Sequence, residues 1–93
     1  MLEVDLSQTQ ARPGERVRAR VRCHGTGPVS AVRLLVEEGG TTYDWPLEPE
    51  GDAWVAEAAV PWDAPPGTYG VSFVAYGPDG RPVDTSWKSF TVL

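Results

Sequence analysis

The sequence predicts an all-β fold: one domain, residues 1–93, built as an antiparallel sandwich of about seven strands. Nine prolines and ten glycines are spread along the chain in short clusters, and no stretch of about 12 residues between them keeps a helical period. Residues 69–76 carry apolar side chains at every second position, as a strand with one buried face requires. A chain of this length buries roughly 60–65% of its unfolded surface, which is enough for one core but too little for a deep substrate cavity.

The first two strands are expected over residues 2–10 and 15–23, joined by a turn at residues 12–15. In the second strand, inward residues alternate with arginines: Val17, Ala19, Val21 and Cys23 face the core, and Arg16, Arg18, Arg20 and Arg22 face outward. If the turn sets the pairing, Arg22 lies opposite Asp5. The four arginines then form cross-strand charge pairs, and an anion-binding stripe on the same side chains is the alternative.

The next strands are expected over residues 30–38, 42–47 and 53–60, followed by one after the corner at 61–67 and one at the C-terminal end. Gly39-Gly40 is predicted to be a two-residue hairpin turn. In the last strand, the residues up to Trp87 and those from Phe90 onward differ in parity, so we predict a bulge near Lys88-Ser89.

The segment from Trp54 to Val83, with the pattern W…VP…PPGTYGVSFVAYGPDGRPV, resembles the last three strands of bacterial immunoglobulin-like and fibronectin-III-like domains. The resemblance implies an immunoglobulin-like sandwich. It also implies that Tyr69 is a tyrosine corner, whose hydroxyl bonds back to a backbone group, and that Trp54 is a core aromatic. Since Cys23 is the single cysteine, the disulfide of antibody domains is absent, and we expect Cys23 to be buried and unreactive.

The composition argues against several classes of function. A net charge of -5 disfavours nucleic acid as a partner, and no apolar run approaches about 18 residues, so no membrane insertion is expected. No signal peptide is recognisable, and a secreted or cell-surface location is implied by the resemblance alone. His24 is the single histidine, and the acids at 48, 50 and 52 lack the spacing of a calcium loop. We therefore predict no metal, no cofactor and no catalytic residue, and we do not expect an enzyme.

An exposed apolar patch is the main candidate site. If residues 71 and 73 face the core, the outer face of the same sheet carries Leu35, Val74, Tyr76 and Trp87. Such a patch indicates a protein partner, which is a neighbouring domain, another protein or a second copy of the chain. The alternative is that errors of strand phase bury two of these aromatics.

Two further tryptophans, Trp45 and Trp62, are candidates for stacking on sugar rings, although Trp62 in its proline-rich loop has the alternative role of capping the open end of the sandwich. These features and the resemblance lead us to expect a non-enzymatic accessory module, a spacer or an adhesion and interaction unit, of a larger bacterial surface or secreted protein. The alternative function is a carbohydrate-binding module attached to a polysaccharide-active enzyme.

Overall fold

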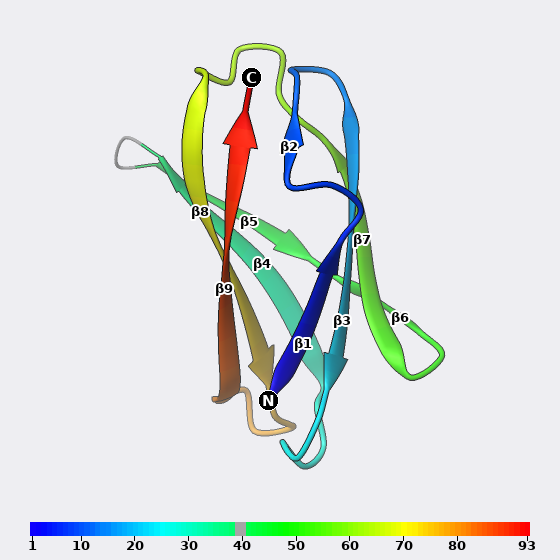
Figure 1. Cartoon of the computed structure of the whole chain (residues 1–93). Helices are drawn as coiled ribbons and strands as arrows, with labels where there is room; N and C mark the ends of the chain where they lie inside the picture. Colours follow the sequence, from blue (N-terminus) through cyan, green and yellow to red (C-terminus); the bar gives the residue numbers. More distant parts are fainter. Residues whose placement is uncertain (39–40) are drawn as a thin grey trace.

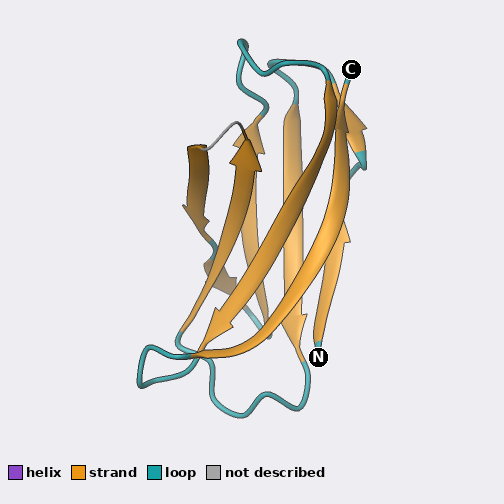
Figure 2. Cartoon of the chain, turned by 90° about the vertical axis from the view of Figure 1, so that its left-hand side faces the viewer, coloured by secondary structure: helices purple, strands orange, loops and turns teal. Residues whose placement is uncertain are grey.

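The computed structural model describes residues 1–38 and 41–93, and the predicted Gly39-Gly40 turn lies outside them. This part of the chain contains strands and turns but no helix, which confirms the all-β prediction. Its strands are β1 (Leu2–Leu6), β2 (Gln10–Ala11), β3 (Arg16–Cys23), β4 (Ala31–Glu38), β5 (Thr41–Pro46), β6 (Glu48–Glu50), β7 (Ala53–Ala59), β8 (Gly67–Tyr76) and β9 (Pro82–Val92). They form two layers, and the two chain ends lie at opposite ends of the layers (Figures 1 and 2).

The two layers are sheets that pack in a sandwich-like arrangement. One sheet has four strands in the order β1-β3-β7-β6, and the other has five in the order β2-β9-β8-β4-β5. Paired strands run antiparallel, except that β2 runs parallel to β9. The short strand β6 pairs with β7 through a turn at Gly51, whose φ of 60° lies in the left-handed region that favours glycine.

The segment 2–10, which the sequence predicts as one strand, changes sheets in its middle. The Ser7 N–H still donates to the Arg18 carbonyl on β3, at 2.8 Å. Two residues later, the Thr9 carbonyl accepts a hydrogen bond from the Thr91 N–H on β9, at 3.0 Å. The prediction of one long strand is therefore wrong, because the backbone groups of this segment form hydrogen bonds first with one sheet and then with the other.

The core lies between the sheets and is centred on Phe73, Val21 and Val32, the largest fully buried side chains. Around them pack further buried residues of both sheets: Leu2, Val4, Ala19, Leu47, Val71 and Ala75. The predicted inward faces of 17–23 and 69–76 are thus confirmed for their central residues. Cys23 is an exception, since it pairs with Leu2 at the end of β3 and is half-buried rather than buried. Its partial burial raises the pKa of the thiol.

The register of β1 on β3 differs from the prediction by two residues. Arg22 pairs with Glu3 and Arg20 with Asp5, whereas the sequence pointed to Arg22 opposite Asp5. The reason is that the turn at 12–15 does not join β1 to β3 directly, because β2 and its pairing with β9 stand between them. A turn fixes strand register only where it connects the two strands that pair.

The bulge predicted at Lys88-Ser89 is also wrong. Strand β9 pairs with β8 without interruption from Asp84 to Val92, and the irregularity lies at the other end, where Tyr76 meets Pro82. Residues 85 and 87 face outward and residues 90 and 92 face inward, so their different parity follows from regular alternation and requires no extra residue.

The corner before β8 is held by Tyr69, whose hydroxyl donates a hydrogen bond to the Pro65 carbonyl. The Tyr69 ring packs on a smaller buried cluster at this end of the molecule, formed by Ala11, Val60 and Val92. Trp54 on β7 lies partly buried against the main core. Tyr69 therefore ties the corner before β8 to a buried cluster, and Trp54 adds its ring to the edge of the main core.

Candidate functional site

The outer face of the five-stranded sheet carries the four residues of the candidate patch, but it does not bring them together. Leu35, Ser72 and Trp87 lie side by side in one cross-strand row on β4, β8 and β9. Tyr76 lies four residues further along β8, roughly 13 Å from Ser72 at about 3.3 Å per residue. Trp87 and Tyr76 are therefore on the same face without being neighbours.

Trp87 is the most exposed member of the candidate patch, with 63% of its surface accessible. Its indole lies over Gly70: a Cβ atom at Gly70 would come within 2.5 Å of the indole Nε1. The absence of a side chain at Gly70 thus lets the ring approach the sheet closely. The indole presents its other side to the surroundings.

The remaining patch residues contribute much less exposed area. Leu35 and Tyr76 are half-buried, and Val74 is only 8% exposed although it faces outward. Arg33, the neighbour of Val74 on β4, forms an ion pair with Asp44 at 2.6 Å from Nε to Oδ1. The hydrogen bond that Arg33 donates to the Asp44 carboxylate raises the pKa of the Arg33 guanidinium. The outer face is accordingly mixed: an exposed tryptophan beside half-buried apolar residues and a charge pair.

The two tryptophans considered for sugar stacking occupy different environments. Trp45 on edge strand β5 pairs with Leu34, which packs against the core, so Trp45 faces the opposite sheet and is 42% exposed. Trp62 is 84% exposed and packs over Gly14, where a Cβ would lie 2.5 Å from its ring. Since Gly14 has a φ of +88°, this turn position favours glycine for two reasons, backbone conformation and space for the indole.

Three of the four outward arginines of β3 form ion pairs with carboxylates of β6, β7 and the turn between them. Arg16 contacts Glu57 at 3.1 Å, and Arg18 contacts Glu50 at 3.1 Å. Arg20 lies 4.0 Å from Asp52. This arrangement separates the like charges of these arginines, but through carboxylates on the β6 and β7 side of β3 and not through Asp5 on the first strand.

The titratable side chains of the described residues do not gather into a recognisable metal site. No group of three or more His, Cys, Asp or Glu side chains in this part of the chain is placed to hold a metal ion. The single histidine, His24, lies 3.3 Å from the Glu3 carboxylate at the surface. No helix long and apolar enough to cross a membrane occurs in the described residues.

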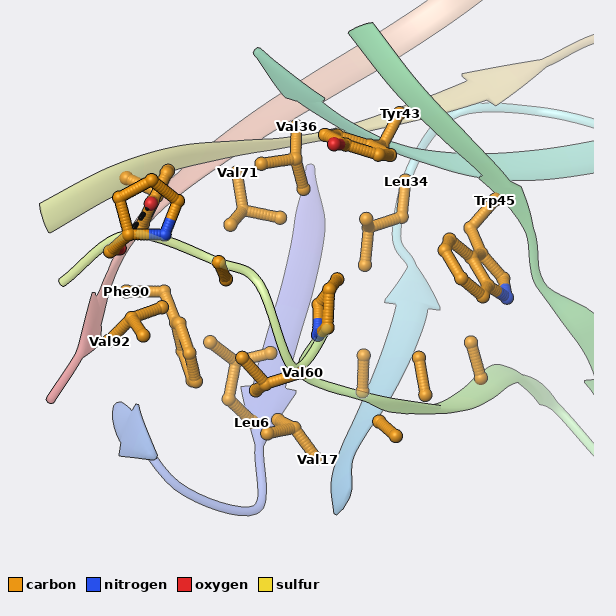
Figure 3. Close-up of a pocket in the computed structure, with 18 of the residues that line it drawn as sticks. Leu6, Val17, Leu34, Val36, Tyr43, Trp45, Val60, Val71, Phe90 and Val92 are labelled. Atoms are coloured by element: carbon orange, nitrogen blue, oxygen red, sulfur yellow. Dashed lines mark hydrogen bonds between the residues drawn. The ribbon is translucent and has the colours of Figure 1, made fainter. Parts of the chain in front are cut away.

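A cavity that the sequence analysis did not anticipate lies between the sheets (Figure 3). Its volume is about 410 Å³, and aliphatic, aromatic and alanine side chains form most of its lining. Leu34, Val36 and Val71 of the five-stranded sheet point into it from one side, and Leu6 and Val17 from the other (Figure 3). The sequence predicts no deep substrate cavity in so short a chain, and this cavity is a hollow that is open to solvent.

This cavity is too large to be an ordinary packing defect. An enclosed and empty volume of 410 Å³ would cost about 10 kcal/mol at roughly 24 cal/mol per Å³, which is comparable to the whole stability of a small domain, about 5–15 kcal/mol. The exposed residues of its lining lie on edge strand β5, where Tyr43 and Trp45 are each 42% exposed, and on the segment 59–65, so the cavity is open to solvent between them. Molecules from the solvent can therefore fill it.

Two sequence features could have indicated the cavity. Tyr43 and Trp45 lie directly opposite Val36 and Leu34 in the β4–β5 pairing, so their side chains belong to the same inner face of the sheet. On the facing sheet, small residues recur where larger apolar ones would fill a sandwich core, namely at Ala19, Ala56 and Ala58.

Comparisons with known proteins show that the fold is similar to solved structures, but they do not assign the chain to a family. No protein-family model matches the sequence, and no curated protein sequence matches it. An engineered protein aligns over 100% of this chain and 20% of its own length, with a TM-score of 0.68 and 22% identity. A Niemann-Pick type C2 protein from the Japanese carpenter ant aligns over 98% of this chain and 89% of its own, with a TM-score of 0.65 and 4% identity.

The soluble domain of PmoD from a Methylocystis species (Rockwell) aligns over 100% of this chain and 91% of its own, with a TM-score of 0.62 and 12% identity. At identities this low, the likeness extends to the fold alone. This chain spans about a fifth of the length of the engineered protein it matches.

Proposed function

We propose that this chain is an immunoglobulin-like accessory module without enzymatic activity, which contacts protein surfaces through the outer face of its five-stranded sheet. The sheet orders support the immunoglobulin-like assignment. The order β1-β3-β7-β6 corresponds to strands A, B, E and D of that fold, and β9-β8-β4-β5 corresponds to G, F, C and C′. The hydrogen bond from Tyr69 back to Pro65, four residues earlier, is of the tyrosine-corner kind.

The observation that carries the interaction proposal is the exposed indole of Trp87. Tryptophan is enriched at the centres of protein interfaces, where it supplies large apolar area at small cost in side-chain entropy. Trp87 is 63% exposed, held against Gly70 and flanked across the strands by Ser72 and, beyond it, half-buried Leu35. A partner surface that covers this row would bury the indole without rearranging the sheet.

A protein partner is favoured over a carbohydrate by the placement of the tryptophans. Sugar-binding surfaces need aromatic rings beside polar donors on one accessible face. Here Trp87 belongs to the outer face of β9, whereas Trp45 faces the space between the sheets. The proposed setting, a larger bacterial surface or secreted protein, rests on the resemblance of segment 54–83.

The proposal is tested by sedimentation equilibrium over a wide range of protein concentration, with wild type, Trp87→Ser and Trp62→Ser. Trp62 is the matched control, because it is also an exposed indole lying over a glycine. We expect self-association of the wild type to be weakened about tenfold or more by Trp87→Ser and to be unchanged by Trp62→Ser.

Equal effects of the two substitutions would contradict the proposed face, since they would reflect general apolar exposure. A wild-type chain that stays monomeric would exclude a second copy as the partner. The same pair of substitutions is then compared in a chain that includes the neighbouring domains, by measuring the contact between domains.

A further inference from the structure

We propose that the cavity between the sheets binds one neutral, apolar small molecule, inserted at edge strand β5. The volume of about 410 Å³ falls within the range of roughly 300–1,000 Å³ that is usual for ligand pockets. Its position is separate from the outer face proposed above, because Trp87 lies on the other side of the five-stranded sheet. Evidence against one of the two sites therefore does not count against the other.

The space for this ligand is created by small side chains on one wall. Ala56 and Ala58 of β7 line the cavity on the four-stranded sheet, and their neighbour across the strands, Ala19 of β3, lines it as well. The facing wall carries full-sized residues, including Leu34 and Val36. Sandwich cores are normally filled by interdigitating side chains from both sheets, so a wall of alanines leaves room that the opposite wall does not fill.

The opening is marked by two aromatic rings. Tyr43 and Trp45 stand on β5, the edge strand of the five-stranded sheet, and each is partly exposed while also lining the cavity. An edge strand has no neighbour on one side, so a molecule can pass beside it without breaking strand pairing. The rings supply flat apolar contacts together with one hydroxyl and one indole N–H at the surface.

The charges at the cavity favour a neutral ligand. Of the described residues that line it, Asp63 alone carries a formal charge, and that charge is negative. The chain as a whole has a net charge of -5. An anionic head group would be repelled by Asp63, and the lining contains no cationic side chain among the described residues to compensate it.

The test is a fluorescence titration of the wild-type chain with two dyes that share one aromatic nucleus. N-phenylnaphthylamine is neutral, and anilinonaphthalene sulfonate carries a negative charge. We expect saturable binding of the neutral dye at one site per chain, and binding of the sulfonate at least about tenfold weaker. Absence of saturable binding of the neutral dye to folded protein would overturn the proposal, and equal binding of the two dyes would overturn its choice of a neutral ligand.

The site is located with a cavity-filling variant. Ala58→Leu places three additional carbons in the cavity and is expected to weaken binding about tenfold or more, while Ala31→Leu makes the same chemical change on the outer face and leaves binding unchanged. Unchanged binding to Ala58→Leu would overturn the proposal.

Two more variants cover the remaining outcomes. If Ala58→Leu does not fold, Trp45→Ser at the exposed opening replaces it, and retention of full affinity by a folded Trp45→Ser variant contradicts the site. Loss of the dye with Trp87→Ser would show that the dye occupies the outer face, which also contradicts the proposal.

Discussion

Replacing Tyr69 by phenylalanine tests how the corner at residues 61–67 is held to strand β8. The substitution removes the hydroxyl that donates to the Pro65 carbonyl and keeps the ring that packs on the smaller buried cluster. A hydrogen bond of this kind contributes roughly 0.5–1.5 kcal/mol net, and the Pro65 carbonyl is exposed enough to find water when the hydroxyl is gone. We therefore expect a loss of about 1 kcal/mol in the free energy of unfolding, with the fold intact.

The assay is urea denaturation combined with a thermal melt. For a domain of this size, about 1 kcal/mol lowers the melting temperature by roughly 4–8 °C, and the dependence of stability on urea should stay the same. Tyr43→Phe on the exposed edge strand is the matched control and should shift the melt by much less. An unchanged stability of Tyr69→Phe, or a loss equal to that of the control, would refute the structural role of this hydroxyl.

Three further predictions concern the core, the thiol and the tryptophan platform. Phe73→Ala deletes a fully buried ring and should cost about 3–5 kcal/mol in a denaturant melt, and a loss below about 1 kcal/mol would mean that Phe73 is not at the centre of the core. Burial raises the pKa of Cys23 above its ordinary value of 9.0, so alkylation of the thiol should be slower in the native protein than in the unfolded chain. The raised pKa contributes to the free energy of unfolding below the pKa of the unfolded chain, and this contribution should be lost as pH rises through the pKa of the folded chain. Labelling at equal rates in the two states would argue against this. Gly70→Ala should displace the Trp87 indole, which chemical-shift changes of its N–H would report, and it should lower stability by only about 1 kcal/mol or less because the ring is exposed and free to turn outward; an unmoved indole would contradict the contact.

The all-β class and the inward faces of the main strands could be predicted because they depend on local periodicity. Val71, Phe73 and Ala75 alternate with outward residues, and this alternation does not depend on how the strand pairs with its neighbours. The register of β1 on β3 could not be predicted in the same way. It depends on the crossing between sheets after Ser7, which is determined by long-range pairing of β2 with β9.

The candidate site was predicted only in part for a related reason. The face on which Trp87 lies follows from parity, but its neighbours follow from register, and the bulge at Tyr76 and Pro82 places Trp87 opposite Ser72. The cavity depends on which strand faces which across the two sheets. Ala56 and Ala58 can be recognised as part of a cavity wall only when β4 and β5 are known to lie opposite them.

Nuclear magnetic resonance of the tryptophan indole N–H groups tests whether the chain binds through the outer face around Trp87. Spectra are recorded as the concentration of the chain, or of its partner domain, is raised. We expect the Trp87 indole signal to shift or broaden with binding, together with amides of β8 and β9, and the Trp62 indole signal to stay unchanged. Binding that perturbs Trp62 and leaves the Trp87 indole unaffected would contradict it.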